Sequence, residues 1–144
     1  MRKIVACVVL LAAGSLGLAF RAAASGTGVT FVPEGEASWH DVPDRPGVKI
    51  AVLEGNPSKG PAHFLLKLPA GYVAAKHHHT ADHYAVVLSG KLVVTIAEGP
   101  QLLPAGSYFS FTNQVKHAAR CHLGADCVIF VDSRDKWDDV ADAH

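Results

Sequence analysis

The chain has 144 residues, and its 13 lysines and arginines balance 13 aspartates and glutamates. It has no basic run and no interleaving of aromatic with basic residues, so the sequence argues against nucleic acid as a partner. No cationic amphipathic stretch predicts binding to a membrane surface either. We therefore expect a small-molecule ligand or substrate, and we leave a homodimer open as the assembly.

Residues 1–24 are predicted to be a cleavable signal peptide. Arg2 and Lys3 precede an apolar run over residues 4–11, and alanines at 22–24 offer a small-residue cleavage site. This order is typical of secretory leaders. An uncleaved membrane anchor is the alternative, although the apolar run is short for one. We expect a periplasmic or secreted mature protein that is not attached to a membrane after cleavage.

The mature chain of about 120 residues is long enough for one domain with one core. Residues 25–47 are rich in glycine, proline and acidic residues and predict an N-terminal arm with little structure. Residues 48–133 alternate short β-prone segments with turn residues and show no long helical period, which predicts an all-β sandwich or barrel. The strands are expected at 48–53, 62–68, 77–79, 84–88, 91–97, 107–111, 115–122 and 127–132.

Residues 134–144 form a polar C-terminal tail, expected to be a short helix or disordered, with Trp137 as its anchor to the body. Before the tail, Cys121 and Cys127 flank a segment whose Gly124 favours a hairpin turn. An oxidising compartment would allow these cysteines to form a disulfide. Two free, buried thiols are the alternative, and the sequence leaves both open.

Four histidines stand at spacings that allow them to share one metal ion. The pattern is Gly71-X5-His77-X-His79-X3-His83-X6-Gly90, followed by Gly106-X10-His117. Side chains alternate along a strand, so His77 and His79 face one side while His78 faces the other. His83 opens the next strand, where we expect it to approach as part of an antiparallel pair, and His117 must arrive through tertiary folding.

We predict that His77, His79, His83 and His117 bind one divalent transition ion. Imidazole nitrogen suits Zn, Ni, Cu and Fe(II), and the sequence does not choose among them. The remaining histidines are expected to be structural or to lie at the surface; they are His40, His63, His122 and His144.

The spacing resembles the first metal motif of the cupin superfamily, whose fold is a double-stranded β-helix, or jelly-roll barrel. The family usually has glutamate where this chain has His83. The resemblance to three-histidine cupins, which include thiol and diketone dioxygenases, implies that a site can work without this carboxylate. A neutral nitrogen in its place would leave the bound ion with its full +2 charge and favour Zn, Cu, Ni or Fe(II) over Mn.

The second cupin motif is matched at Gly106 and His117 only. Thr112, Gln114 and Cys121 stand where the family has proline, glycine and asparagine. Asn113 can take over the turn, because asparagine tolerates a left-handed backbone. The resemblance covers roughly residues 48–132.

Strand parity also predicts the lining of a pocket beside the metal. The small or apolar residues on the ligand side are Ala85, Val87, Ala119 and Cys121, and Phe109 and Phe111 are expected to form an aromatic wall. Tyr72 and Tyr84 are put forward as catalytic phenols, with core aromatics as the alternative. Our hypothesis is an exported mononuclear metal-binding cupin of the small-molecule dioxygenase type. A non-catalytic sensor or carrier that binds a metal or small ligand is the alternative.

Overall fold

The computed structural model describes residues 28–33 and 35–142, so the predicted signal peptide and His144 lie outside the described residues. One compact unit begins at Val32 and includes all the strands of the described chain. Over the described residues the chain forms strands and turns but no helix. Accordingly, none of these residues belongs to a helix of the length and hydropathy needed to cross a membrane.

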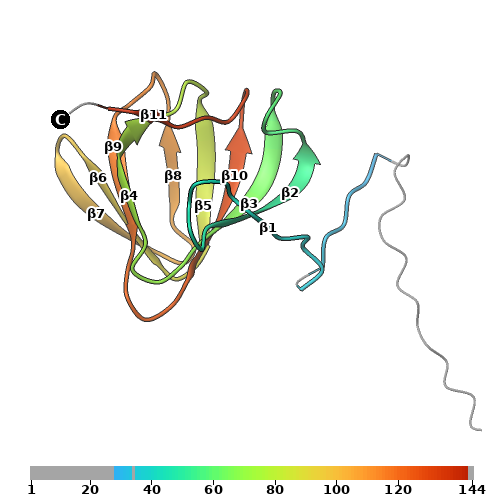
Figure 1. Ribbon diagram of the computed structural model, residues 1–144, viewed down its shortest axis with the longest axis horizontal. Helices are drawn as coiled ribbons and strands as arrows, with labels where there is room; N and C mark the ends of the chain where they lie inside the picture. Colours follow the sequence, from blue (N-terminus) through green and yellow to red (C-terminus); the bar gives the residue numbers. More distant parts are fainter. Residues whose placement is uncertain (1–27, 34, 143–144) are drawn as a thin grey trace, which may run out of the picture. The chain divides into compact units, whose positions relative to one another are not determined.

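The described strands form two sheets, and every pairing within them is antiparallel (Figure 1). The first sheet has the order β1 (His40–Asp41), β2 (Lys49–Gly55), β3 (Ala62–Leu68), β10 (Cys127–Ser133), β5 (His83–Ser89) and β8 (Tyr108–Phe111). The second has the order β11 (Val140–Ala141), β4 (Val73–His78), β9 (His117–Cys121), β6 (Lys91–Ile96) and β7 (Gly99–Pro104). This arrangement confirms the predicted all-β class.

Strand periodicity builds the interior between the two sheets. In β5, His83, Ala85 and Val87 are buried, whereas Tyr84 and Val86 between them are only half-buried. The same alternation recurs along β10, and its buried positions pack with Phe64, Val87 and Leu92, all fully buried. Because side chains of a strand alternate between faces, β5 directs its motif histidine to the same side as its core residues.

Gly90 allows the chain to pass from β5 in the first sheet to β6 in the second. Its φ of 78° lies in the left-handed region. A Cβ atom there would lie 2.6 Å from the carbonyl oxygen of Asp126 and 2.9 Å from the Cα atom of Cys127. Only glycine satisfies both conditions, so this motif position serves the fold.

The strands β1, β7 and β11 were not expected from the sequence. β1 and β11 have two residues each, and β7 contains Pro100 and ends at Pro104. Proline argues against a central strand because it lacks an N–H donor, but β7 is an edge strand that pairs with β6 alone. The expected helix or disorder in the tail was also wrong over the described residues, since β11 pairs with β4 there.

Cys121 and Cys127 form a disulfide, with their Cα atoms 5.7 Å apart. The predicted hairpin between them was wrong. β9 pairs with β4 and β6, whereas β10 pairs with β3 and β5, so the intervening residues cross from one sheet to the other. The disulfide therefore connects the two sheets.

Reduction of this disulfide should destabilise the protein. In the chain-entropy model, a disulfide that closes a loop this small raises the unfolding free energy by about 2 kcal/mol. Urea unfolding with and without dithiothreitol measures the difference. The double variant Cys121→Ala/Cys127→Ala is the control and should not respond to the reductant. An equal response in both proteins would contradict the assignment.

Candidate metal centre

A β-bulge near the end of β4 sets the direction of His77. Ala74 pairs with Ala119 of β9 and His77 pairs with His117, so one extra residue lies on the β4 side. Residues three apart on a regular strand face opposite sides, but the bulge turns both Ala74 and His77 toward the interior, where they line one cavity. The strand thus places its first motif histidine opposite the histidine of the second motif.

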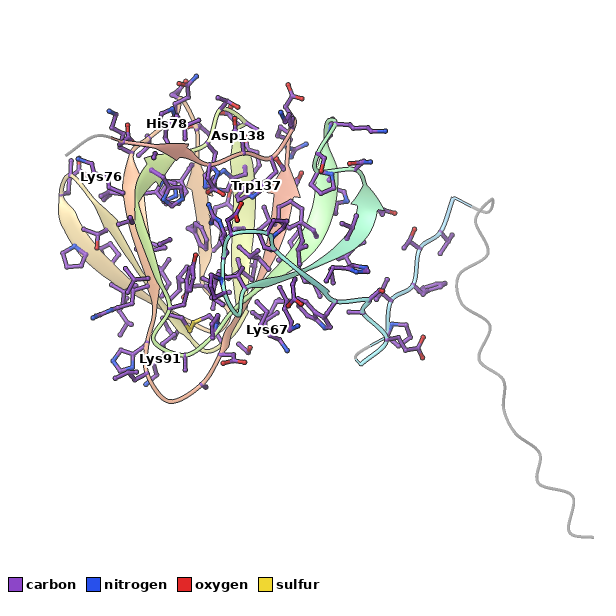
Figure 2. The ribbon with its side chains drawn as sticks, in the orientation of Figure 1. Lys67, Lys76, His78, Lys91, Trp137 and Asp138 are labelled. Atoms are coloured by element: carbon purple, nitrogen blue, oxygen red, sulfur yellow. A yellow bond between two sulfur atoms is a disulfide. The ribbon has the colours of Figure 1, made fainter. Side chains whose placement is uncertain are left out.

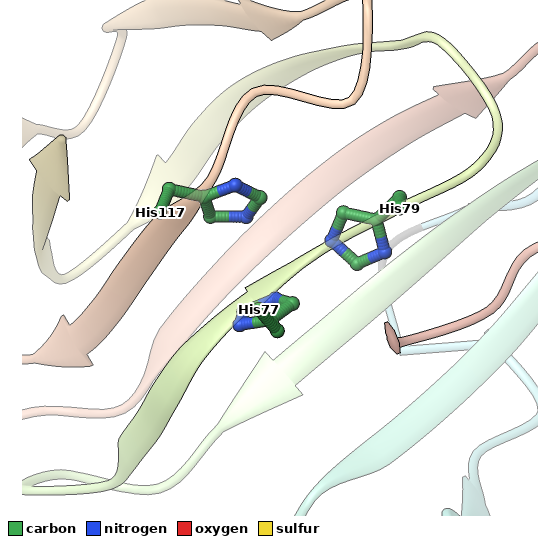
Figure 3. A group of neighbouring side chains, drawn as sticks. All are labelled: His77, His79 and His117. Atoms are coloured by element: carbon green, nitrogen blue, oxygen red, sulfur yellow. The ribbon is translucent and has the colours of Figure 1, made fainter. Parts of the chain in front are cut away.

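His77, His79 and His117 form a compact cluster (Figure 3). One ring nitrogen from each can be chosen so that all three lie within 4.8 Å of one another. The ring centroids are 4.4 Å apart for His77 and His117, 4.9 Å for His77 and His79, and 5.2 Å for His79 and His117. This confirms the expectation that two separated segments bring imidazoles together, and the three nitrogens could hold one metal ion.

Backbone carbonyls fix which nitrogen each ring offers. Nδ1 of His77 donates to the Ala75 carbonyl at 2.7 Å, Nδ1 of His117 donates to Val115 at 2.9 Å, and Nδ1 of His79 donates to Asp138. A carbonyl can only accept, so each neutral ring carries its proton on Nδ1. The Nε2 lone pairs remain available, which is the arrangement found in metal-bound histidines.

Burial favours the neutral form that a metal requires in His79, His83 and His117. Loss of hydration lowers the pKa of His79 to about 3 and that of His117 to about 4, although the backbone hydrogen bonds oppose the shift. Burial lowers the pKa of His83 as well. Because a protonated imidazole cannot coordinate, these buried rings are already in the ligand state at neutral pH. The donor set therefore fits a divalent transition ion of the Zn, Ni, Cu or Fe(II) type.

His83 lies beside this cluster but enters from the other sheet. The predicted antiparallel pair was wrong, because β5 pairs with β10 and β8, whereas β4 belongs to the second sheet. The His83 ring is buried, 4.7 Å from His79 and 6.3 Å from His117 between centroids. It is not part of the group whose ligand atoms all lie within 4.8 Å. Its coordination of the ion stays a prediction.

The other described histidines lie outside the cluster. His78 faces away, as strand parity predicts, and its Nδ1 lies 3.2 Å from Asp142 Oδ2 (Figure 2). His63 lies between carboxylates of Glu54, at 3.0 Å, and Asp132, at 3.5 Å. His40 and His122 are exposed.

A cavity of about 550 Å³ opens beside the three histidines. As predicted, Ala85, Ala119 and the phenylalanines of β8, Phe109 and Phe111, contribute to its lining, and Phe111 stacks on His117 at 3.8 Å. Val87 and Cys121 are fully buried but are not among its lining residues. The walls are otherwise largely aliphatic, with Ile50, Leu66, Val94, Ile129 and Val131.

The two candidate phenols occupy different places. Tyr72 lines the cavity, but it precedes β4 and lies five residues before His77, on the order of 16 Å along a strand. Tyr84 is not a lining residue, and its ring lies 4.9 Å from the Arg134 guanidinium. The catalytic role of Tyr72 stays a prediction, and Tyr84 is placed away from the cavity.

The C-terminal tail supplies site residues that sequence reasoning missed. Trp137 stacks on His79, with ring centroids 4.0 Å apart, and meets Phe64 edge-on at 5.2 Å. Trp137 was predicted to anchor the tail, and it does so at the site itself. Asp139 also lines the cavity and forms an ion pair with Arg45 of the N-terminal arm. Burial raises the pKa of Asp139, and the Arg45 charge opposes this effect.

Comparison with known families agrees with the resemblance found in the sequence. The family described as the ChrR cupin-like domain matches residues 27–136. No curated protein matches the chain.

Solved structures with the same fold come from proteins with different roles. KdgF from Halomonas sp. is 24% identical, with a TM-score of 0.60 over 73% of this chain and 94% of that chain. The anti-sigma factor ChrR, solved in complex with SigE from Rhodobacter sphaeroides, is 20% identical, with a TM-score of 0.56 over 70% of this chain and 51% of that one. The DMSP lyase DddQ from Ruegeria pomeroyi is 20% identical, with a TM-score of 0.56 over 68% and 56%. These likenesses confirm the predicted jelly-roll fold.

The cluster geometry predicts unequal effects of neighbouring histidines on metal binding. His79→Ala and His117→Ala should each abolish stoichiometric binding, because each removes one of the three converging Nε2 atoms. His78→Ala should leave the stoichiometry intact, because its ring faces Asp142. Metal content of untagged protein after dialysis against Zn or Ni measures this. Equal losses for His78→Ala and His79→Ala would show that the histidine triplet binds metal without the folded site.

The metal-free protein should lose stability in acid. Below about pH 6.5 the unfolded chain protonates its histidines, whereas the folded state keeps His79 neutral to about pH 3 and His117 to about pH 4. The unfolded state then binds more protons, so the unfolding free energy falls as the pH drops through this window. Urea unfolding in EDTA at pH 7.5 and 5 measures the loss. The variant His79→Gln/His117→Gln should show a smaller loss, and an equal loss would contradict the assignment.

Proposed function

Because this chain belongs to the ChrR cupin-like domain family, we propose that it is an exported metalloprotein with a dioxygenase-type activity on a small apolar molecule. One divalent transition ion would be bound by His77, His79 and His117, with His83 as a further predicted ligand. The substrate would occupy the cavity beside the cluster. Zn, Ni, Cu and Fe(II) all suit the nitrogen donors, and the oxygenase activity requires a redox-active member of this group.

The observation that carries this proposal is the position of the three histidines at the wall of an apolar cavity. Three protein nitrogens leave a coordination position open on a four-coordinate ion, and a five- or six-coordinate ion keeps one open when a fourth protein ligand is added. When bound, the ion would supply Lewis-acid chemistry or an oxygen-binding centre. The residues of the chain would hold the ion and restrict access of water to it.

The cavity lining supports an apolar substrate of modest size. About 550 Å³ falls within the range of small-molecule sites. Aliphatic and aromatic side chains make up most of the wall, and the charged residues that line it, Arg45 and Asp139, are paired with each other. An apolar ring or chain would replace water in such a space, and the ion would supply the main polar interaction.

Export is supported by the disulfide as well as by the leader-like sequence at residues 1–24. Cys121 and Cys127 are paired and both are completely buried. Disulfides persist mainly in oxidising compartments. We therefore propose that the mature protein is periplasmic or secreted.

A non-catalytic sensor or carrier is the second candidate function. Its support comes from the anti-sigma factor ChrR among proteins of this fold and from the matching family. The lyase DddQ shows that the same fold also occurs in an enzyme. Fold alone does not choose between the two functions, so the choice rests on turnover.

Oxygen consumption distinguishes these two functions. Untagged protein is loaded in turn with Fe(II), Ni, Cu or Zn, and oxygen uptake is followed with diketone, thiol and phenolic compounds. We expect uptake with a redox-active metal and a matching compound, and none with Zn or with the His117→Ala variant. Stoichiometric metal and ligand binding without oxygen uptake for any of these compounds would favour the sensor or carrier.

A further inference from the structure

The C-terminal segment fixes the position of Asp139 in the lining of the cavity. In Figure 1 this segment runs from the end of β10 across the ends of the strands to β11. On one side of Asp139, the Asp138 carboxylate accepts hydrogen bonds from the Thr80 backbone N–H at 2.9 Å and from its hydroxyl at 2.6 Å. On the other side, Val140 pairs with His78. Both neighbours are held, so the position of Asp139 is set by the fold.

The two carboxylate oxygens of Asp139 have different surroundings. Oδ2 is paired with the Arg45 guanidinium. Oδ1 is buried and makes no hydrogen bond with any described residue; it lies 3.4 Å from His77 Nε2 and 3.5 Å from His79 Nδ1. A buried carboxylate oxygen without a hydrogen bond is costly, and it requires an explanation such as a bound ion.

The contact between Asp139 and His77 is one between two electron-pair donors. His77 Nδ1 donates to the Ala75 carbonyl, so the neutral ring presents a lone pair at Nε2. Oδ1 of the carboxylate also presents lone pairs. Two such atoms facing each other repel unless a proton or a metal ion lies between them, and a ring nitrogen of His77 is already one of those that converge in the cluster.

The spacing of the two atoms also suits a shared ion. Two ligand atoms bound at about 2.1 Å lie about 3.0 Å apart when their bonds meet at a right angle and about 3.4 Å apart at the tetrahedral angle. The observed distance between Oδ1 and His77 Nε2 is 3.4 Å. The distance from Oδ1 to His77 Nε2 is therefore compatible with two ligands of one ion, whereas the nearer nitrogen of His79 is its protonated Nδ1, at 3.5 Å.

We propose that Asp139 Oδ1 is a ligand of the metal ion held by His77, His79 and His117, so that the C-terminal segment supplies the carboxylate that the histidine motif lacks at His83. This inference rests on the proposed metal centre. The carboxylate lowers the net charge of the ion together with its ligands from +2 to +1. It also adds an oxygen donor, which extends the metal preference toward Fe(II) and Mn. Arg45 is paired with the other oxygen, Oδ2, and leaves Oδ1 to the ion.

Metal binding by the parent and three variants tests the inference. Asp139→Asn keeps the shape of the side chain but removes its charge. Asp135→Asn is the matched control, since Asp135 is an exposed aspartate of the same segment. Arg45→Gln breaks the ion pair without changing the ligand oxygen. Affinities for Zn and Mn come from competition with a chelator, and the visible spectrum of the Co(II) form reports the ligand set.

We expect Asp139→Asn to weaken metal binding by at least about tenfold, since even supporting residues around a metal site have effects of this size. It should also change the Co(II) spectrum and reduce the affinity for Mn more than that for Zn. Asp135→Asn should match the parent in all three measurements. Arg45→Gln should keep the parent Co(II) spectrum.

Two results would overturn the inference while leaving the metal centre in place. In the first, Asp139→Asn keeps the affinity and the spectrum of the parent. In the second, Arg45→Gln reproduces every change seen in Asp139→Asn, which would mean that Asp139 acts only by holding the segment. A parent protein that binds no metal would instead overturn the proposed function itself. Urea unfolding of each variant verifies that the fold is retained.

Discussion

The candidate site depends on hydrogen bonds from histidine Nδ1 atoms to backbone carbonyls. Carbonyls of Ala75, Val115 and Asp138 each accept one such bond. They fix the tautomer and direct the Nε2 lone pairs of three rings toward one another. Burial maintains this neutral state by lowering the pKa values of His79 and His117. The carbonyls therefore set the tautomer and the direction of the rings, whereas burial sets the neutral state of His79 and His117 against the effect of these hydrogen bonds.

The barrel alone does not complete this arrangement. One of the three carbonyls, that of Asp138, belongs to the C-terminal segment, as does Trp137, which stacks on His79 and lines the cavity. In Figure 2, Trp137 lies below Asp138, toward the interior. The segment thus orients His79, stacks Trp137 on its ring and brings the Asp139 carboxylate into the lining of the cavity. A tail that adds little to the core contributes much of the site.

The position of Asp139 bears on the replacement of the usual cupin glutamate by His83, which removes a negative charge from the histidine motif. A set of neutral nitrogens alone leaves the ion with its full charge inside a largely apolar cavity, where charge is poorly solvated. Asp139 lies far from position 83 in the sequence. In the folded protein, however, its carboxylate approaches His77 and His79 of the cluster. The charge balance of a metal site can therefore be provided by a segment far from the motif.

Strand periodicity and motif spacing were sufficient to predict the all-β class, the inward direction of His77, His79 and His117, and the outward direction of His78. These features follow from local alternation of side chains, which the sequence itself determines. The left-handed turn at Asn113, with a φ of 56°, was also predictable locally, because asparagine tolerates this backbone conformation. Tertiary structure alone decided which strands share a sheet. It placed His83 on the sheet opposite His77, made the Cys121–Cys127 bond a link between sheets and brought Asp139 to the histidines. No local pattern encodes these contacts, because each joins segments whose proximity depends on how the whole chain packs.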